Sequence, residues 1–253
     1  MKTRIILCGA CGKMGGNVLS LLAEDNDAQA VCGVDLFPRE IGIPVYKSFS
    51  DIKEQADIII DFSSAENLAE RLEYAKTKGL GIVLASTGFT EKDLQLIDEY
   101  SAFVPIFKTA NLSLGVNVMQ ALVKLTAEIL GDNYDIGIIE KHHNLKKDAP
   151  SGTALMLADS VNDAFDEHKQ IINGRGGIVG ARTKKEIGMH AVRGGTIVGE
   201  HEVIFAGEDE IITISHSARS KRVFATGAIR AAKFLHGKGA GKYEMKHLLA
   251  EEN

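Results

Sequence analysis

The chain has 253 residues, of which 45% are hydrophobic and 25% charged, and its formal net charge at pH 7 is −5. This length suits one large domain or two smaller ones, and the composition is ordinary for a soluble globular protein. The negative charge argues against a protein that binds nucleic acid through a basic face, and no uninterrupted apolar run approaches the length of a membrane span. We therefore expect neither nucleic acid nor a membrane as a partner.

The amino-terminal segment and the cysteines favour a cytoplasmic protein. The first apolar run is brief and meets a glycine loop at Gly9, so we expect no signal peptide. The cysteines, Cys8, Cys11 and Cys32, are odd in number, and no second pair completes a zinc site with the C-x-x-C of the first two. We expect reduced thiols and no metal, with a redox or metal role as the alternative.

The first half of the chain alternates short apolar runs with helical patterns. Such alternation predicts βαβ units and a parallel sheet. Strands are expected at residues 4–8, 28–34, 56–62, 80–85 and 104–107, with a helix around residues 18–22 and further helices near 66–78 and 91–100.

From about residue 113 the pattern changes to a long helix followed by several β-like runs. Helices are expected at residues 116–130, 152–166, 222–235 and 242–250, and strands at 134–139, 187–193, 196–205 and 210–216. This pattern predicts a second, α+β domain with an open sheet.

The glycine loop from Gly9 to Gly15 has the spacing G-x-x-G-x-x-G and lies between a predicted strand and a predicted helix. Asp35 ends the next predicted strand, twenty residues after Gly15. In dinucleotide-binding domains such glycines let the backbone approach a pyrophosphate, and such an acidic residue binds the adenosine ribose. The sequence predicts a site for a nicotinamide cofactor, and a tight turn without a ligand is the alternative.

The most informative segment runs from residue 140 to residue 153. His142, His143 and Lys146 precede Ser151, Gly152 and Thr153, where an apolar helical pattern begins. A helix amino terminus is a ready site for an anion, and histidine and lysine are proton donors. The segment therefore predicts an acid catalyst beside an anion site. Adjacent residues of a strand point to opposite faces, so both histidines could serve one site only if the strand has ended there.

These residues match a known family. The pattern E-x-H-H-x-x-K-x-D-A-P-S-G-T-A is present from Glu140 to Ala154, together with G-x-x-G-x-M-G at Gly9–Gly15 and Asn-Leu-Ser-Leu-Gly-Val-Asn at residues 111–117. The chain resembles 4-hydroxy-tetrahydrodipicolinate reductase (dihydrodipicolinate reductase) of the diaminopimelate and lysine pathway over essentially its whole length.

The resemblance implies an α/β fold with a Rossmann-type, parallel-sheet dinucleotide-binding domain and an α+β substrate and oligomerisation domain with an open mixed sheet. We expect the first domain to comprise residues 1–112 with 220–253, and the second residues 113–219. The resemblance also implies a homotetramer built through the second domain's sheet.

The resemblance further implies reduction of a cyclic imine dicarboxylate by NADH, NADPH or both. His142 would be the acid/base and Lys146 a proton donor, and substrate carboxylates would bind His143, Ser151, Gly152 and Thr153. The implied cofactor-binding residues are Gly9, Ala10, Cys11, Gly12, Lys13, Met14, Asp35, Ala85, Ser86, Thr87, Thr109, Ala110, Asn111 and Leu112. Because Leu36 follows Asp35 where some relatives carry arginine, NADH is expected to be favoured.

Two other classes remain as alternatives. A dinucleotide-sensing protein without turnover would not need paired proton donors beside an anion site. Another two-domain amino-acid dehydrogenase would share the first half of the chain but not the segment Asp-Ala-Pro-Ser-Gly-Thr.

Overall fold

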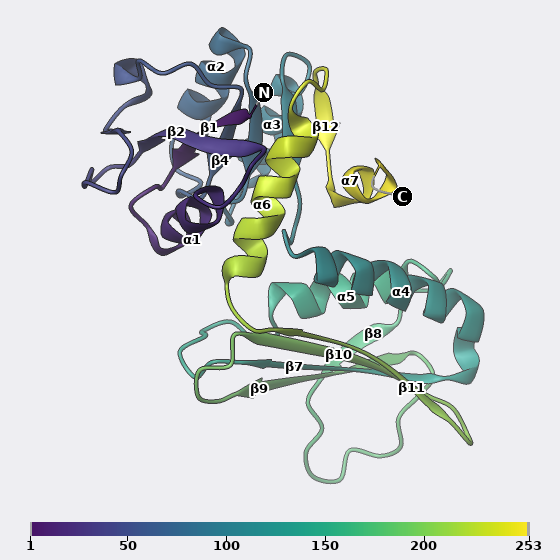
Figure 1. Ribbon diagram of the computed structural model, residues 1–253. Helices are drawn as coiled ribbons and strands as arrows, with labels where there is room; N and C mark the ends of the chain where they lie inside the picture. The colour runs from purple at the N-terminus through teal and green to yellow at the C-terminus, as the bar shows by residue number, and fades with distance from the viewer. Residues whose placement is uncertain (1, 252–253) are drawn as a thin grey trace. The chain divides into compact units, whose positions relative to one another are not determined.

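The computed structural model describes residues 2–251, and the chain divides into two compact units. Unit 1 runs to Ser113 and resumes at Lys221, and unit 2 runs from Leu114 to Ser220. The carboxy-terminal elements therefore complete the unit that the amino-terminal half begins (Figure 1).

Unit 1 contains a seven-stranded, fully parallel sheet. Its strands are β1 (Thr3–Cys8), β2 (Ala28–Val34), β3 (Val45–Tyr46), β4 (Ile58–Asp61), β5 (Gly81–Leu84), β6 (Pro105–Lys108) and β12 (Gly241–Tyr243). Their order is β12-β6-β5-β4-β1-β2-β3, so the direction of winding reverses between β1 and β4. In sheets of this kind ligands bind outside the carboxyl ends of the strands at that reversal.

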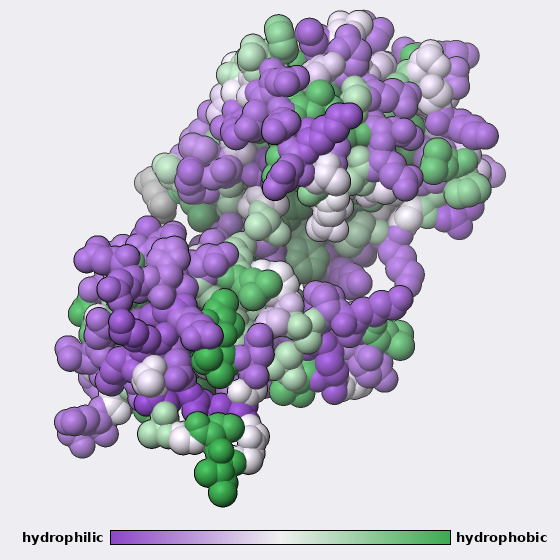
Figure 2. Space-filling view, turned by 180° about the vertical axis from the view of Figure 1, so that it is seen from behind, coloured by the Kyte–Doolittle hydropathy of each residue, from purple (hydrophilic) through white to green (hydrophobic). Residues whose placement is uncertain are grey.

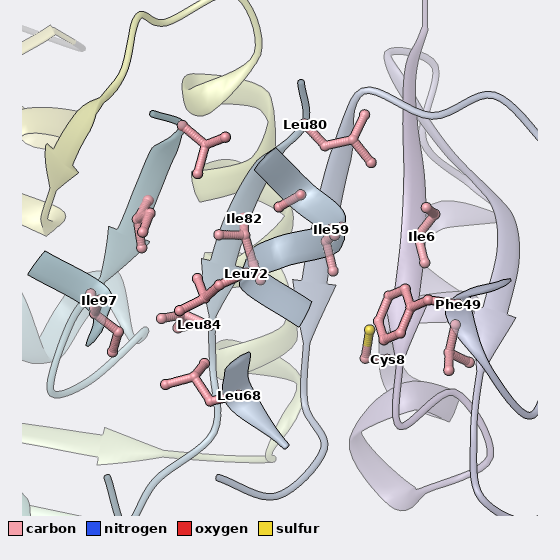
Figure 3. Packing of buried hydrophobic residues seen from close by; sticks show 14 of the residues in the cluster. Ile6, Cys8, Phe49, Ile59, Leu68, Leu72, Leu80, Ile82, Leu84 and Ile97 are labelled. Atoms are coloured by element: carbon pink, nitrogen blue, oxygen red, sulfur yellow. The ribbon is translucent and has the colours of Figure 1, made fainter. Parts of the chain in front are cut away.

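Helices cover both faces of this sheet. They are α1 (Lys13–Leu22), α2 (Leu68–Lys78), α3 (Glu91–Tyr100), α6 (Arg222–Leu235) and α7 (Met245–Glu251), with a short 3₁₀ turn at Phe49–Asp51. Because helices lie against both faces, central strands such as Ile58-Ile59-Ile60 are apolar without alternation. Figure 3 shows Leu68 and Leu72 of α2 packed toward Ile82 and Leu84 of β5.

Unit 2 is a five-stranded mixed sheet with two helices packed against its apolar face. Its strands are β7 (Asp135–His142), β8 (Gln170–Asn173), β9 (Glu186–Arg193), β10 (Gly199–Ala206) and β11 (Ile211–Ala218), and its helices are α4 (Leu114–Leu130) and α5 (Gly152–Asn162), with a 3₁₀ turn at Gly131–Asn133. The strand order is β11-β10-β7-β9-β8, with β10 antiparallel to β7 and β11, and β9 parallel to β7 and β8.

Three parts of this arrangement differ from the sequence-based predictions. The segment expected to be a helix at 242–250 begins as β12, which pairs with β6, and becomes helical only at Met245. Strands β3 and β8 were not predicted. Strand β7 continues past Ile139 to His142, because β9 pairs with it from Ile136 to His142.

One helix is apolar enough to be checked as a membrane span. Residues Leu114–Asn133 satisfy the length and composition of such a helix, but Met119, Val123 and Ala127 pack into the core of unit 2. The opposite face of this helix leaves Leu125 and Ile129 exposed. One such helix is weak evidence for a membrane span. Figure 2 shows a mainly hydrophilic face on which hydrophobic side chains gather in limited places.

Candidate active site

The loop between β1 and α1 has the geometry of a pyrophosphate-binding turn. Gly9 has a φ of +72°, and a Cβ there would lie 2.9 Å from the carbonyl oxygen of Phe62. Gly12 donates its N–H to the oxygen of Gly9 at 3.0 Å and starts α1 without a side-chain cap. The first N–H groups of a helix have no intrahelical acceptor, so they can bind a phosphate at this position.

Asp35 follows β2 and is held against this loop. Its Oδ2 accepts the N–H of Cys11 at 2.9 Å, and its Oδ1 accepts that of Phe37 at 3.0 Å. The guanidinium of Arg39 donates to the carbonyl oxygen of Cys11, which places a cation at the same loop. A pocket beside Asp35 is lined also by Phe37 and Lys47. The acidic side chain thus lies where an adenosine ribose would be expected.

The remaining cofactor candidates follow β5 and β6. Ala85, Ser86 and Thr87 continue from β5, and residues 109–112 continue from β6. Because carboxyl ends of parallel strands meet at one edge, these segments share that edge with the glycine loop. Asn111 is fixed by the N–H of Ser113, which donates to its Oδ1 at 2.8 Å.

The residues of unit 1 fit a bound dinucleotide. The glycine loop leaves space for backbone approach, and Asp35 offers a fixed carboxylate. The hydroxyl oxygen of Ser86 is buried and has no hydrogen-bond partner among the described residues. A buried polar group without a partner is costly, so a ligand that supplies one is favoured at that edge.

In unit 2 a buried carboxylate organises the residues of the signature segment. Glu140 is fully buried, and its Oε2 lies 2.6 Å from Nδ1 of His142. Arg193 at the end of β9 donates from Nη1 to Oε2 at 2.8 Å and from Nη2 to Oε1 at 2.7 Å. Burial by itself raises the pKa of Glu140. The hydrogen bonds from Arg193 and His142 lower it by more than burial raises it, so the net pKa lies below its ordinary value.

The same carboxylate holds the turn at the start of α5. Ser151 donates its N–H to Oε1 of Glu140 at 3.0 Å, and its hydroxyl caps the helix by accepting the N–H of Ala154 at 3.2 Å. The hydroxyl also lies 3.0 Å from Nε2 of His201. Both polar groups of Ser151 therefore have protein partners. Gly152 and Thr153 form the first turn of α5.

His201 is a buried neighbour of the acid/base candidate. Its ring lies 5.2 Å from that of His142 in an edge-on arrangement. Burial, with a smaller contribution from His142, lowers the pKa of His201 to about 4. His201 is therefore neutral near pH 7 and adds no positive charge beside His142.

The other proton-donor candidate lies in the turn after β7. Lys146 donates its backbone N–H to the oxygen of His143 at 3.1 Å, and its Nζ lies 2.7 Å from Oδ2 of Asp148. The ammonium of Lys146 lowers the pKa of Asp148. Nδ1 of His143 is buried without a partner among the described residues. The structure thus brings the unit 2 candidates together around the carboxyl end of β7 and the start of α5.

No role was assigned to Glu140, Arg193 or His201 from the sequence. A signal for Glu140 was present, because Ile136 and Ile138 precede it at alternate positions and point into the core. Period-2 alternation places Glu140 on that inward face, where a carboxylate needs partners. Arg193 carries no comparable signal, since only the β7–β9 register reveals its place beside His142.

Comparisons with known proteins cover the whole chain. The family model described as dihydrodipicolinate reductase, N-terminus, matches residues 3–112, and the corresponding C-terminus model matches residues 115–249. A 4-hydroxy-tetrahydrodipicolinate reductase of Caldanaerobacter subterraneus is 48% identical over 249 residues, which cover 98% of this chain and 99% of that protein.

Solved structures show the same fold. A dipicolinate-bound dihydrodipicolinate reductase from Paenisporosarcina sp. TG-14 has a TM-score of 0.76 and 23% identity, covering 96% of this chain and 98% of that one. An engineered D-amino acid dehydrogenase bound to NADP⁺ has a TM-score of 0.59 and 14% identity, covering 100% of this chain and 97% of that one.

Proposed function

The chain belongs to the dihydrodipicolinate reductase family, and from this premise we propose how its residues perform the family's reaction. That reaction is the NAD(P)H-dependent reduction of the dihydrodipicolinate or 4-hydroxy-tetrahydrodipicolinate ring to tetrahydrodipicolinate, in diaminopimelate and lysine biosynthesis. One observation carries the proposal: the carboxylate of Glu140 is hydrogen-bonded both to His142 and to the turn that starts α5.

Unit 1 holds the dinucleotide, which supplies the hydride when bound. Residues 9–14 wrap the pyrophosphate and Asp35 binds the adenosine ribose. Residues 85–87 and 109–112 line the nicotinamide, and the unpartnered hydroxyl of Ser86 supports this placement.

Unit 2 binds the substrate, a cyclic imine dicarboxylate. Gly152 and Thr153 offer the amino terminus of α5 to a substrate carboxylate, and His143 adds a polar contact. Ser151 supports this contact by holding the turn in place, because its hydroxyl caps the helix and its N–H is bonded to Glu140. Hydride arriving at ring C4 builds negative charge on the conjugated imine, and protonation by Lys146 or His142 removes that charge.

A substrate comparison tests this assignment against the two alternatives. Fresh product of dihydrodipicolinate synthase is offered with NADH or NADPH, and aspartate semialdehyde is offered in parallel as a substrate of homoserine-type dehydrogenases. We expect nicotinamide oxidation only with the first. Oxidation only with the second would favour another amino-acid dehydrogenase, and cofactor binding without any oxidation would favour a sensing protein.

We expect NADH to have the higher kcat/KM, with NADPH also used. The carboxylate of Asp35 is fixed at the glycine loop and repels a 2′-phosphate, while Arg39 and Lys47 lie near enough to make NADPH acceptable. The kcat/KM values for NADH and NADPH are measured at one ionic strength, for the unchanged protein and for Arg39→Ala. A clear NADPH preference that Arg39→Ala abolishes would show that Arg39 outweighs Asp35.

We propose that the protein is a homotetramer assembled through the unit 2 sheet. One face of this sheet carries α4 and α5, and its edge strand β11 leaves Ile211 and Ile212 exposed. Exposed apolar residues on a sheet edge favour association with another chain. Light scattering should give about four times the chain mass of 27.3 kDa. A monomer mass at working concentration would contradict the proposal.

We place the protein in the cytoplasm, without a nucleic-acid or membrane partner. The support is the formal net charge of −5 and the packing of one face of α4, through Met119, Val123 and Ala127, into the core of unit 2.

A further inference from the structure

We propose that Glu140 is a positioning residue for proton transfer: its buried carboxylate fixes the tautomer of His142 and ties that ring to the turn at the start of α5. The inference rests on the proposed role of His142 as the acid/base and deepens it. It assigns no contact between Glu140 and the substrate.

The carboxylate of Glu140 is surrounded by donors. Oε2 faces Nδ1 of His142 at 2.6 Å and Nη1 of Arg193 at 2.8 Å. Oε1 faces Nη2 of Arg193 at 2.7 Å and the N–H of Ser151 at 3.0 Å. The side chain is 0% exposed, so these protein groups take the place of water around the charge.

This environment determines which nitrogen of His142 carries a proton. Burial raises the pKa of Glu140, but the hydrogen bonds and charges of Arg193 and His142 keep it below its ordinary value, so the carboxylate is ionised near pH 7 and can only accept hydrogen bonds. Nδ1 of His142 must therefore carry hydrogen. Nε2 is then the nitrogen that exchanges a proton with substrate, as in other histidines oriented by a carboxylate.

One glycine keeps a side chain away from Nε2. A Cβ at Gly199 would lie 3.1 Å from Nε2 of His142. Any side chain at this position would crowd the nitrogen. The ring is thus anchored at Nδ1, and Gly199 brings no side chain against Nε2.

Charged and titratable groups lie around His142 on three strands. They are Glu140 on β7, Arg193 on β9 and His201 on β10. The Lys146–Asp148 ion pair lies in the turn after β7. His201 is neutral because burial lowers its pKa to about 4. The positive charge of Arg193 offsets part of the attraction between Glu140 and a protonated His142. The effect specific to Glu140 is therefore the choice of tautomer.

The same group of contacts fixes the anion-binding turn. Arg193 donates from Nη2 to the carbonyl oxygen of Asp148 at 2.6 Å, and Glu140 accepts the N–H of Ser151. Both ends of the segment from Asp148 to Ser151 are therefore bonded to the Glu140–Arg193 pair. The proton donor and the substrate's carboxylate site are held by one ion pair.

The test is Glu140→Gln, which keeps the shape of the side chain. At the Oε1 position the amide nitrogen would meet two fixed donors, Nη2 of Arg193 and the N–H of Ser151. At the Oε2 position it would meet one fixed donor, Nη1 of Arg193, and a histidine nitrogen that can become an acceptor. The amide nitrogen should therefore face His142 and require Nδ1 to accept. We expect ¹⁵N NMR of histidine-labelled protein to show His142 changing from the Nδ1–H to the Nε2–H tautomer. His142 signals are assigned by their loss in His142→Gln. We expect kcat to fall by about 10²- to 10⁴-fold, with the dissociation constant for NADH unchanged.

Two further variants separate positioning from a purely structural ion pair. Glu200→Gln is the matched control, because Glu200 lies on neighbouring β10 and pairs with Lys141 at 3.3 Å; it should change neither tautomer nor kcat. Glu140→Gln combined with Arg193→Met removes both partners and should restore much of the Tm that Glu140→Gln alone loses. The tautomer and kcat should stay altered in this double variant.

Each contrary result has a distinct meaning. An unchanged His142 tautomer in Glu140→Gln would overturn the positioning role alone. Recovery of kcat together with Tm in the double variant would reduce the pair to a structural role and overturn the proposal. A changed tautomer with full kcat would overturn both this proposal and the proton-transfer role of His142.

Discussion

Replacing His142 or Lys146 by alanine is expected to lower kcat by roughly 10²- to 10⁴-fold, the usual contribution of a positioned acid. The dissociation constant for NADH should stay nearly unchanged, because the dinucleotide loops belong to unit 1 and both residues belong to unit 2. Steady-state kinetics and a fluorescence titration with NADH measure the two quantities.

The chain offers a matched control for each variant. Lys147 is exposed beside Lys146, and His190 is exposed on β9. Lys147→Ala and His190→Ala should retain kcat within about threefold, a change of less than 1 kcal/mol in the activation barrier. Loss of NADH binding in His142→Ala or Lys146→Ala would contradict the division of labour between the units.

The two adjacent glycines of α1 should respond in opposite ways to alanine. A Cβ on Gly15 would lie 2.4 Å from the carbonyl oxygen of Ala10, so Gly15→Ala must push the glycine loop away from the helix. Overpacking of this kind costs about 1–3 kcal/mol, and displacement of the loop should weaken NADH binding as well. A Cβ on Gly16 would meet nothing within 4 Å.

Gly16→Ala should therefore be neutral or stabilising by up to about 1 kcal/mol, since alanine is the better helix former. Urea unfolding gives both free energies of unfolding, and a titration gives the NADH affinities. Equal destabilisation by the two variants would show that α1 does not pack against the glycine loop as described.

The parallel sheet of unit 1 could be predicted from the sequence because its central strands are buried on both faces. Runs such as Ile58–Ile60 are continuously apolar, and glycine turns or helical patterns separate them. Strands β3 and β12 could not be predicted in this way. They have two and three residues, too few for an apolar run of their own. β3 is defined by pairing with the preceding strand β2, and β12 by pairing with β6, which lies far earlier in the chain.

The site was predictable to the extent that its residues are contiguous. His142, His143, Lys146 and the start of α5 lie in one segment whose residue types indicate proton transfer and anion binding. Arg193, the ion-pair partner of Glu140, could not be predicted from this segment. Arg193 is 53 positions away, and it reaches the carboxylate only because β9 pairs in parallel with β7 and sets Arg193 opposite His142.

The proposed reaction transfers hydride from the nicotinamide to the ring of the substrate, and a deuterium label follows this transfer directly. NADH carrying deuterium at C4 of the nicotinamide is mixed with the protein and fresh dihydrodipicolinate synthase product, and the product is analysed by mass spectrometry. We expect tetrahydrodipicolinate with deuterium at ring C4, and a loss of this transfer in His142→Ala and Lys146→Ala. Oxidation of the cofactor without deuterium in the product, or no oxidation at all, would contradict the proposed reaction.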